Sequence, residues 1–237
     1  MRGLIHERET ACFIVDSSLE QGALSKVPAL PGERLAMISA IVLAAGESKR
    51  MGQPKQLLTW QGKTLLQHVL ESLTHSDAEE IILVLGHESD RITKSLPTLP
   101  IKIVINQDYD QGMASSLRQG LLAMDPKSEA FLVCLADQPG IGPEIMNDLI
   151  REFRQADPKR GIVRPVYRSL RGHPVLIGAQ YLQEALHLQG DVGARRILMN
   201  HPEDILEIDV DQDAVLKDID TPEEYQEYSK RAGPGES

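Results

Sequence analysis

The sequence has few aromatic residues and few cysteines. Aromatic side chains make up 4% of the 237 residues, and no basic stretch carries interleaved aromatics. This argues against a nucleic-acid-binding protein, because such proteins combine cationic grooves with aromatic stacking platforms. Only two cysteines are present, Cys12 and Cys134, which is too few for a disulfide framework and is compatible with a reducing cytoplasm.

Long apolar runs are missing as well. No run approaches the roughly 18 residues that a membrane helix needs, and the first residues contain no apolar segment of secretory length. We therefore expect a cytoplasmic protein without a membrane span. The formal net charge is −10, but the excess of acid lies in residues 202–237, which hold 12 acidic and 3 basic side chains. The preceding residues 38–201 are balanced in charge.

The first residues, 1–37, show no sustained periodicity and contain Pro28, Pro31 and Gly32. We interpret them as a loosely ordered extension. One domain is then expected over residues 38–230, with a frayed tail over 231–237. Met37 stands directly before the first strong strand pattern and is an alternative translation start, so a chain that begins at Met37 is expected to fold.

From residue 38 the chain alternates short apolar runs with helical patterns. Continuous apolar runs indicate strands that are covered on both faces, and they lie at 38–44, 81–85, 101–105, 130–136, 161–167, 174–177 and 204–210. Amphipathic helices are expected at 65–73, 113–122 and 145–153. The alternation predicts βαβ units with right-handed crossovers, and therefore a three-layer α/β/α domain around a mostly parallel sheet.

The loop LAAGESKRMGQPK, residues 43–55, follows the first predicted strand. Ligands of such sheets bind beyond the carboxyl ends of the strands, and small residues with nearby cations suit an anion. Gly46 and Gly52 do not have the spacing of a P-loop, and GxGxxG is absent, which argues against a nicotinamide dehydrogenase. From these residues alone, a connecting loop and a phosphate-binding loop both stay open.

The same loop resembles the signature LxAGxSxRMGxxK of the MobA-like nucleoside-triphosphate transferases. Every specified position agrees, namely Leu43, Ala45, Gly46, Ser48, Arg50, Met51, Gly52 and Lys55. Five later stretches resemble, in order, the molybdenum-cofactor cytidylyltransferase branch: QGMASSLRQGL, LADQPGI, RGHPVLI, GDVGARRIL and DIDTPEEY. The resemblance spans about 38 to 228. It implies a Rossmann-like, glycosyltransferase-A-like fold with one antiparallel strand, and Mg²⁺-dependent transfer of an NMP from an NTP with release of pyrophosphate.

The resemblance also implies roles for individual residues, with Arg50, Lys55 and Asp137 as the catalytic group. The triphosphate is expected to bind Leu43, Ala44, Ala45, Gly46, Ser48, Arg50 and Lys55. The base and ribose are expected to contact Gly112, Met113 and Ser116, with Asn106 beside them. The metal ligands would be Asp137 and Asp220, and the acceptor would meet Arg171, His173, Asp191 and Arg195.

Purely structural interpretations stay open for several of these residues. Asp137 also suits the turn before Pro139, and Ser115 or Ser116 suits a helix N-cap. Thr221 begins a capping box for a final helix, which leaves Asp220 unexplained. Asp191 is a possible helix cap, and His173 a possible hydrogen-bonded structural histidine.

The substrates implied by the resemblance are CTP and molybdenum cofactor (molybdopterin). Ala45 and Pro54 stand where guanylyl-type relatives have Gly and Asp, and LADQP is typical of the cytidylyl branch. One alternative is transfer from GTP or another nucleotide to another phosphorylated acceptor. The other is a non-catalytic chaperone that delivers the cofactor to a molybdenum hydroxylase, with the acidic last segment as its docking surface.

Overall fold

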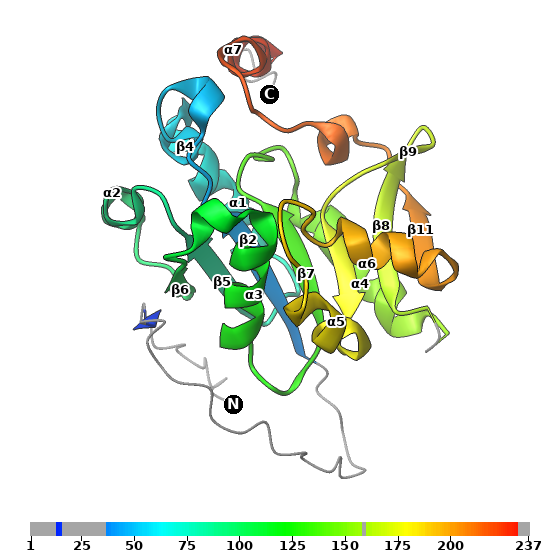
Figure 1. Cartoon of the computed structure of the whole chain (residues 1–237). Helices are drawn as coiled ribbons and strands as arrows, with labels where there is room; N and C mark the ends of the chain where they lie inside the picture. The colour runs from blue at the N-terminus through cyan, green and yellow to red at the C-terminus, as the bar shows by residue number, and fades with distance from the viewer. Residues whose placement is uncertain (1–12, 16–36, 158–159, 232–237) are drawn as a thin grey trace, which may run out of the picture.

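The computed structural model describes residues 13–15, 37–157 and 160–231 of the chain. These residues form a mixed sheet of nine strands with helices on both faces (Figure 1). Along the sheet the strands follow the order β1 (Phe13–Val15), β6 (Lys102–Ile105), β5 (Glu80–Leu85), β2 (Met37–Ala44), β7 (Ser128–Leu135), β10 (Val175–Gly178), β8 (Ile162–Tyr167) and β11 (Ile205–Asp209). The ninth strand, β9 (Leu170–Arg171), pairs with β8.

The strand directions confirm the predicted α/β class. β2 pairs in parallel with both β5 and β7, and β6 extends the parallel set. β10 runs antiparallel to both of its neighbours, β7 and β8, as the family resemblance implied for one strand. The short β9 is antiparallel to β8 as well. All of the predicted apolar runs form strands, with boundaries that differ by one or two residues.

The two faces of the sheet belong to two separate hydrophobic cores. In β2, Ala40 and Val42 pack into one core and Ile41 and Leu43 into the other, because successive strand residues point to opposite faces. The helices that contribute to the first core are α1 (Leu65–Thr74), α2 (Ser89–Ser95) and α4 (Pro143–Gln155). Those of the second core are α3 (Met113–Ala123), α5 (Leu182–Leu186) and α6 (Arg195–Asn200). Burial on both faces explains the continuous apolar runs in the sequence.

The apolar face predicted for residues 113–122 is only partly correct. Leu117 is fully buried, but Met113 is 39% exposed and Leu122 is 63% exposed. Helix α3 instead presses Gly120 against the sheet, so closely that a Cβ atom on it would lie 2.5 Å from Cγ2 of Ile41. The contact face of α3 therefore includes Gly120 together with Leu117 and Leu121.

Three residues of the predicted N-terminal extension form strand β1, which pairs in parallel with β6 at the edge of the sheet. The loosely ordered extension stays a prediction. Residues 1–12 and 16–36 lie outside the described part of the chain. Of the predicted tail, Arg231 is the last residue of α7 (Pro222–Arg231), and 232–237 again lie outside. The domain boundaries and the alternative start at Met37 stay predictions.

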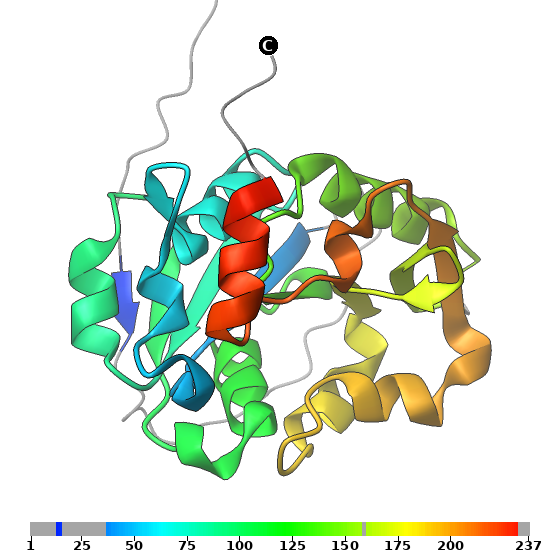
Figure 2. The same ribbon diagram turned by 90° about the horizontal axis from the view of Figure 1, so that it is seen from above.

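The last segment returns across the carboxyl edge of the sheet. After η6 (Asp213–Leu216), α7 packs on a hairpin formed by β3 (Thr59–Trp60) and β4 (Lys63–Thr64), next to it in Figure 2. The rings of Trp60 and Tyr228 lie 4.8 Å apart, and the Tyr225 hydroxyl donates to the Thr59 carbonyl at 2.5 Å. This packing brings the segment around Asp220 to the ends of the central strands.

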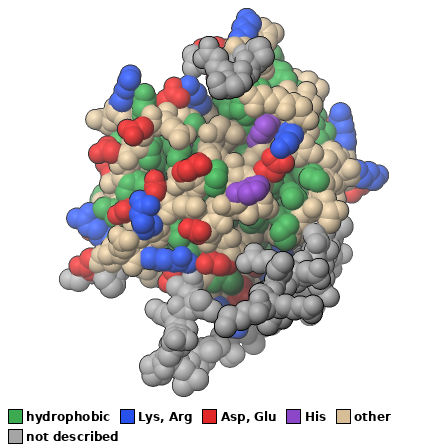
Figure 3. All heavy atoms as spheres, turned by 180° about the vertical axis from the view of Figure 1, so that it is seen from behind, with side chains coloured by type: hydrophobic (Ala, Val, Ile, Leu, Met, Phe, Trp, Pro, Cys, Tyr) green, Lys and Arg blue, Asp and Glu red, His purple; other side chains and the backbone are tan. Residues whose placement is uncertain are grey.

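Charges of both signs are interspersed over the described residues on the face shown in Figure 3. Within the part of the chain that the structure describes, no helix combines the length and the apolar character that crossing a membrane requires.

Candidate active site

A cavity of about 780 Å³ opens at the carboxyl ends of β2 and β7. Its walls come from five places in the sequence: the loop after β2, the turn before α3, the end of β7, the loop before α6 and the segment before α7. Thirteen of the predicted site residues line it: Leu43, Ala44, Ala45, Gly46, Ser48, Arg50, Lys55, Gly112, Met113, Ser116, Asp137, Asp191 and Asp220. The cavity lies where ligands of α/β sheets bind.

The loop after β2 is held by its own polar side chains. Ser48 adopts a left-handed backbone conformation with φ 54°, and its hydroxyl accepts the Lys55 N–H at 3.1 Å. Gln56, which is 1% exposed, donates from Nε2 to the carbonyls of Ala44 at 2.9 Å and Gly46 at 3.3 Å. Sequence reasoning missed Gln56, because a glutamine beside a lysine gives no sign that it is buried.

Four charged side chains meet in the cavity. Lys55 Nζ donates to Asp137 Oδ2 and, at 2.6 Å, to Asp220 Oδ1. Arg50 Nη2 donates to the other oxygen of Asp220, also at 2.6 Å. The Lys55 side chain is 17% exposed, Asp137 12% and Asp220 23%, whereas Arg50 is 67% exposed. The cations predicted for the triphosphate therefore contact the carboxylates predicted for the metal.

Burial and charge act on these groups in opposite directions. Burial raises the pKa of Asp137, and the charge of Lys55 offsets this only in part. Burial also opposes ionisation of Asp220, but the bonds from Lys55 and Arg50 outweigh it and lower the pKa of Asp220. For Lys55, burial is outweighed by the two carboxylates, so its pKa is raised. We conclude that Lys55 is a firmly held cation between two acids.

One oxygen of this cluster has no hydrogen-bond partner among the described residues. Asp137 Oδ1 is buried, while its Oδ2 accepts from Lys55. A buried carboxylate oxygen without a donor is costly. Two carboxylates that converge on one point, one of them with a free oxygen, fit a hard divalent cation, which takes one or two carboxylates together with phosphate oxygens and water.

The turn before α3 depends on Gly112. Its φ of 98° and ψ of 175° belong to a region that is essentially restricted to glycine, and a Cβ atom there would lie 2.7 Å from the backbone carbon of Gly190. The close approach lets the Ala114 N–H donate to the Gly190 carbonyl at 3.0 Å, and the Met113 N–H donate to Asp191 Oδ1 at 3.2 Å.

These contacts place four of the predicted residues. Asp191 caps α3 and lines the first cavity, apart from the other residues predicted for the acceptor. Asn106 is 1% exposed and is not among the residues lining the cavity; its Nδ2 donates to the hydroxyls of Ser115 and Ser116 at 2.9 and 3.0 Å. Neither serine is the N-cap of α3, which is Gly112. Tyr109, which was not predicted for the site, lines the cavity, and so does Asp218, the acid two residues before Asp220.

A second cavity, of about 840 Å³, contains the remaining predicted acceptor residues, Arg171, His173 and Arg195, together with Arg160 and Arg164. Arg164 is 8% exposed and pairs with Glu207, which also accepts from Arg171 Nε at 3.1 Å. The cavity therefore has a basic lining in an acidic protein.

His173 lines the second cavity but interacts electrostatically with Asp137 and Asp218, which line the first. Burial lowers its pKa, although the charges of Asp137 and Asp218 act in the opposite direction. The ring Nδ1 atom is buried and has no hydrogen-bond partner among the described residues, while the backbone N–H of His173 donates to the Val215 carbonyl at 2.9 Å. We conclude that His173 is neutral near pH 7.

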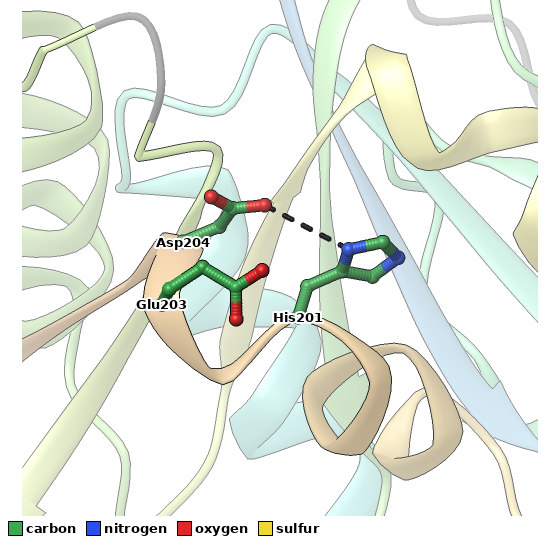
Figure 4. A group of neighbouring side chains, drawn as sticks. All are labelled: His201, Glu203 and Asp204. Carbon is green, nitrogen blue, oxygen red and sulfur yellow. Dashed lines mark ion pairs between the residues drawn. The ribbon is translucent and has the colours of Figure 1, made fainter.

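His201, Glu203 and Asp204 form a separate cluster in the turn before β11 (Figure 4), with potential ligand atoms within 4.8 Å of one another. His201 Nε2 lies 2.7 Å from Glu184 Oε2, and Asp204 accepts the Tyr181 hydroxyl at 2.6 Å. These bonds tie α5 to the turn and account for the cluster without an ion. The histidine spacing had given no sign of it.

The MobA-like NTP transferase domain, as a family model, matches residues 40–205. The chain belongs to this family. Among its relatives, nicotine blue oxidoreductase from Paenarthrobacter nicotinovorans is 34% identical over 199 residues, which cover 80% of this chain and 95% of that protein. Molybdenum cofactor cytidylyltransferase from Escherichia coli (strain K12) is 27% identical over 194 residues, which cover 81% and 95%.

Solved structures support the same placement. The crystal structure of Rv0371c from Mycobacterium tuberculosis H37Rv has a TM-score of 0.75 and 28% identity, and the match covers 82% of this chain and 98% of that one. A complex of Rv0371c with manganese has a TM-score of 0.72 and 26% identity, with coverage of 82% and 99%. This MobA-like chain is thus a nucleotidyltransferase by family and by fold.

Proposed function

We propose that this MobA-like protein transfers CMP from CTP to the phosphate of molybdenum cofactor (molybdopterin) and releases pyrophosphate, with Mg²⁺ as its metal. The observation that carries the proposal is the meeting of Lys55, Arg50, Asp137 and Asp220 in one cavity beside the signature loop. The choice of CTP rests on the cytidylyl-type residues of the sequence and on the similarity to a molybdenum cofactor cytidylyltransferase.

Asp137 and Asp220 would hold the Mg²⁺. Bound there, Mg²⁺ supplies charge neutralisation for the phosphate oxygens. The manganese complex of Rv0371c is consistent with a divalent cation in this fold. On the other side of the cavity, Asp191 and the Gly112 turn hold the start of α3 where the base would lie.

The chain's own residues would act by positioning and charge. Arg50 offers a bidentate fork to phosphate oxygens and Lys55 a point charge. In the second cavity, Arg171, Arg195 and neutral His173 would orient the acceptor. An oxygen of the acceptor phosphate then bonds to the α-phosphorus, and the bond from that phosphorus to the bridging oxygen of the β-phosphate breaks. No protein nucleophile is required, since in-line transfer depends on positioning and electrostatics.

Asp137→Asn tests this function. Pyrophosphate release from CTP, measured with purified cofactor, should fall by at least about a hundredfold, the usual cost of removing a key electrostatic group. Asp211→Asn, an exposed acid in the turn after β11, is the matched control and should keep wild-type activity. Wild-type turnover by a folded Asp137→Asn protein would contradict the metal assignment. Faster release of pyrophosphate from GTP than from CTP would contradict the assignment of CTP as the substrate.

The second candidate function is an oxidoreductase, favoured by the 34% identity to nicotine blue oxidoreductase. Oxidation or reduction of nicotine blue by the protein, in a sample free of NTP, would support it. The third reading, delivery of the cofactor to a molybdenum hydroxylase in the cytoplasm without catalysis, predicts that the protein binds the cofactor but releases no pyrophosphate from any NTP.

A further inference from the structure

Lys55 does not point into open space as a free phosphate ligand would. Its Nζ lies between Asp137 Oδ2 and Asp220 Oδ1 and donates to both, with only 17% of the side chain exposed. The second cation of the cluster, Arg50, is mostly exposed and bonds only the outer oxygen of Asp220. Lys55 is therefore the cation on the shared side of the two carboxylates.

We propose that Lys55 occupies the site of the divalent cation in the free protein. The metal then binds Asp137 and Asp220 only together with the nucleotide, because the phosphates of the nucleotide accept the hydrogen bonds of Lys55 in place of the two carboxylates. This inference rests on the proposed function for the identity of the metal ligands. It assigns Lys55 as a positioning residue for the metal site in the free protein, and it sets the order in which the ligands assemble.

The geometry explains why Lys55 and a metal exclude each other. Lys55 Nζ already donates to one oxygen of each carboxylate, so a cation held by Asp137 and Asp220 would compete with Lys55 for these oxygens. Metal alone would have to break two ion pairs and leave Lys55 buried without a partner. A buried charge that loses its partner is costly.

A triphosphate removes that cost. The four-carbon stem of lysine is flexible and its ammonium has three donors, so Nζ can turn from the carboxylates to phosphate oxygens in the same cavity. The carboxylates are then free for the metal that the triphosphate brings. Metal and nucleotide should therefore bind cooperatively, and metal alone should bind weakly.

The test is a titration of the full chain with Mn²⁺ in the absence of nucleotide, with free Mn²⁺ measured by electron paramagnetic resonance. Lys55→Met and Lys55→Gln should each bind Mn²⁺ at least about tenfold more tightly than wild type, because the carboxylates lose their internal cation. Lys55→Arg, which keeps the charge, should bind as weakly as wild type. The matched control is Lys49→Met, since Lys49 lies in the same loop but pairs with Glu47.

A double variant that combines Lys55→Met with Asp137→Asn shows which site binds the Mn²⁺. The gain from Lys55→Met should vanish in the double variant, whereas Mn²⁺ held by the cluster around His201 would remain. Circular dichroism checks the fold, and Lys55→Gln can still hydrogen-bond both carboxylates if the methionine variant is unstable. Unchanged or weaker Mn²⁺ binding by the folded neutral variants would overturn the inference. Micromolar binding to the Asp137 site of wild type without nucleotide would do so on its own.

These outcomes are separable from failure of the proposed function. An active cytidylyltransferase whose neutral Lys55 variants show no gain in Mn²⁺ affinity would remove only the place-holder role. A protein that releases no pyrophosphate from any NTP, but whose neutral variants do show the gain, would remove only the proposed reaction.

Discussion

Replacing Gln56 by leucine should loosen the signature loop without changing any charged side chain that would bind the phosphates of a substrate. The two side chains have similar volumes, so the substitution leaves little empty space. It removes the amide that donates to the carbonyls of Ala44 and Gly46 at 2.9 and 3.3 Å. It also removes the acceptor that faces the Ser48 hydroxyl at 3.5 Å.

The expected loss of stability follows from the number and quality of these bonds. A buried acceptor that loses its donor costs about 1–3 kcal/mol. The bond to the Ala44 carbonyl is short and buried, while the other two are longer and partly exposed. We expect the free energy of unfolding to fall by about 2 kcal/mol. A triphosphate that binds the variant would have to order the loop again, which costs about 1–2 kcal/mol for each residue that is fixed. The affinity of the variant for the triphosphate should therefore fall about tenfold, which corresponds to about 1.4 kcal/mol.

Gln67→Leu is the matched control for this experiment. Gln67 lies on α1 and makes a comparable pair of bonds, accepting the Thr64 N–H at 2.8 Å and donating to the Ser95 carbonyl at 3.1 Å. Urea denaturation should show a similar loss for both variants, and calorimetric titration with triphosphate should show weaker binding for Gln56→Leu alone. Wild-type affinity in Gln56→Leu, or equal weakening in both variants, would refute the reasoning.

Three other changes have definite expected outcomes. Gly112→Ala should lower the free energy of unfolding, measured with denaturant, by about 2–3 kcal/mol, and Gly190→Ala by about 1 kcal/mol. Both glycines have a positive φ, but only at Gly112 would a Cβ atom lie within 2.7 Å of a backbone atom. Equal losses in the two variants would contradict the close approach. His173 has a lowered pKa in the folded protein, so the unfolded chain takes up the proton first as the pH falls. Relative to His173→Gln, wild type should therefore lose stability below about pH 6.5 and not above it. A constant difference in the free energy of unfolding between pH 5 and pH 8 would argue against burial of a neutral ring. Thr221→Ala removes the hydroxyl that accepts the Glu224 N–H at 3.2 Å and should cost about 0.5–2 kcal/mol, whereas an unchanged melting temperature would mean that α7 unfolds separately.

Most of the architecture was open to prediction because its causes are local. Strands buried on both faces need apolar residues at every position, so they stand out as continuous runs. The signature loop is likewise one stretch of chain, and residues 43–50 and Lys55 line one cavity. The capping box at Thr221 also formed as expected.

Helix α3 shows where local patterns failed. Of its large apolar residues, Leu117 and Leu121 are buried as predicted, whereas Met113 and Leu122 are exposed and Gly120 lies against Ile41 of the sheet. Nothing in the periodicity marks a glycine as a contact residue. The bond from the Met113 N–H to Asp191 could not be predicted either, since it joins residues 78 positions apart.

By itself, the sequence determined the fold class, the strands and the signature loop, and it predicted that Asp137 and Asp220 belong to one site. Only the tertiary structure decided how those charges are arranged. Lys55 meets acids that lie 82 and 165 positions away, and Gln56 is buried beneath the loop. The physical reason is that a pattern records what each residue can do, while the partner of a buried charge depends on which distant segments the folded chain brings within hydrogen-bond distance.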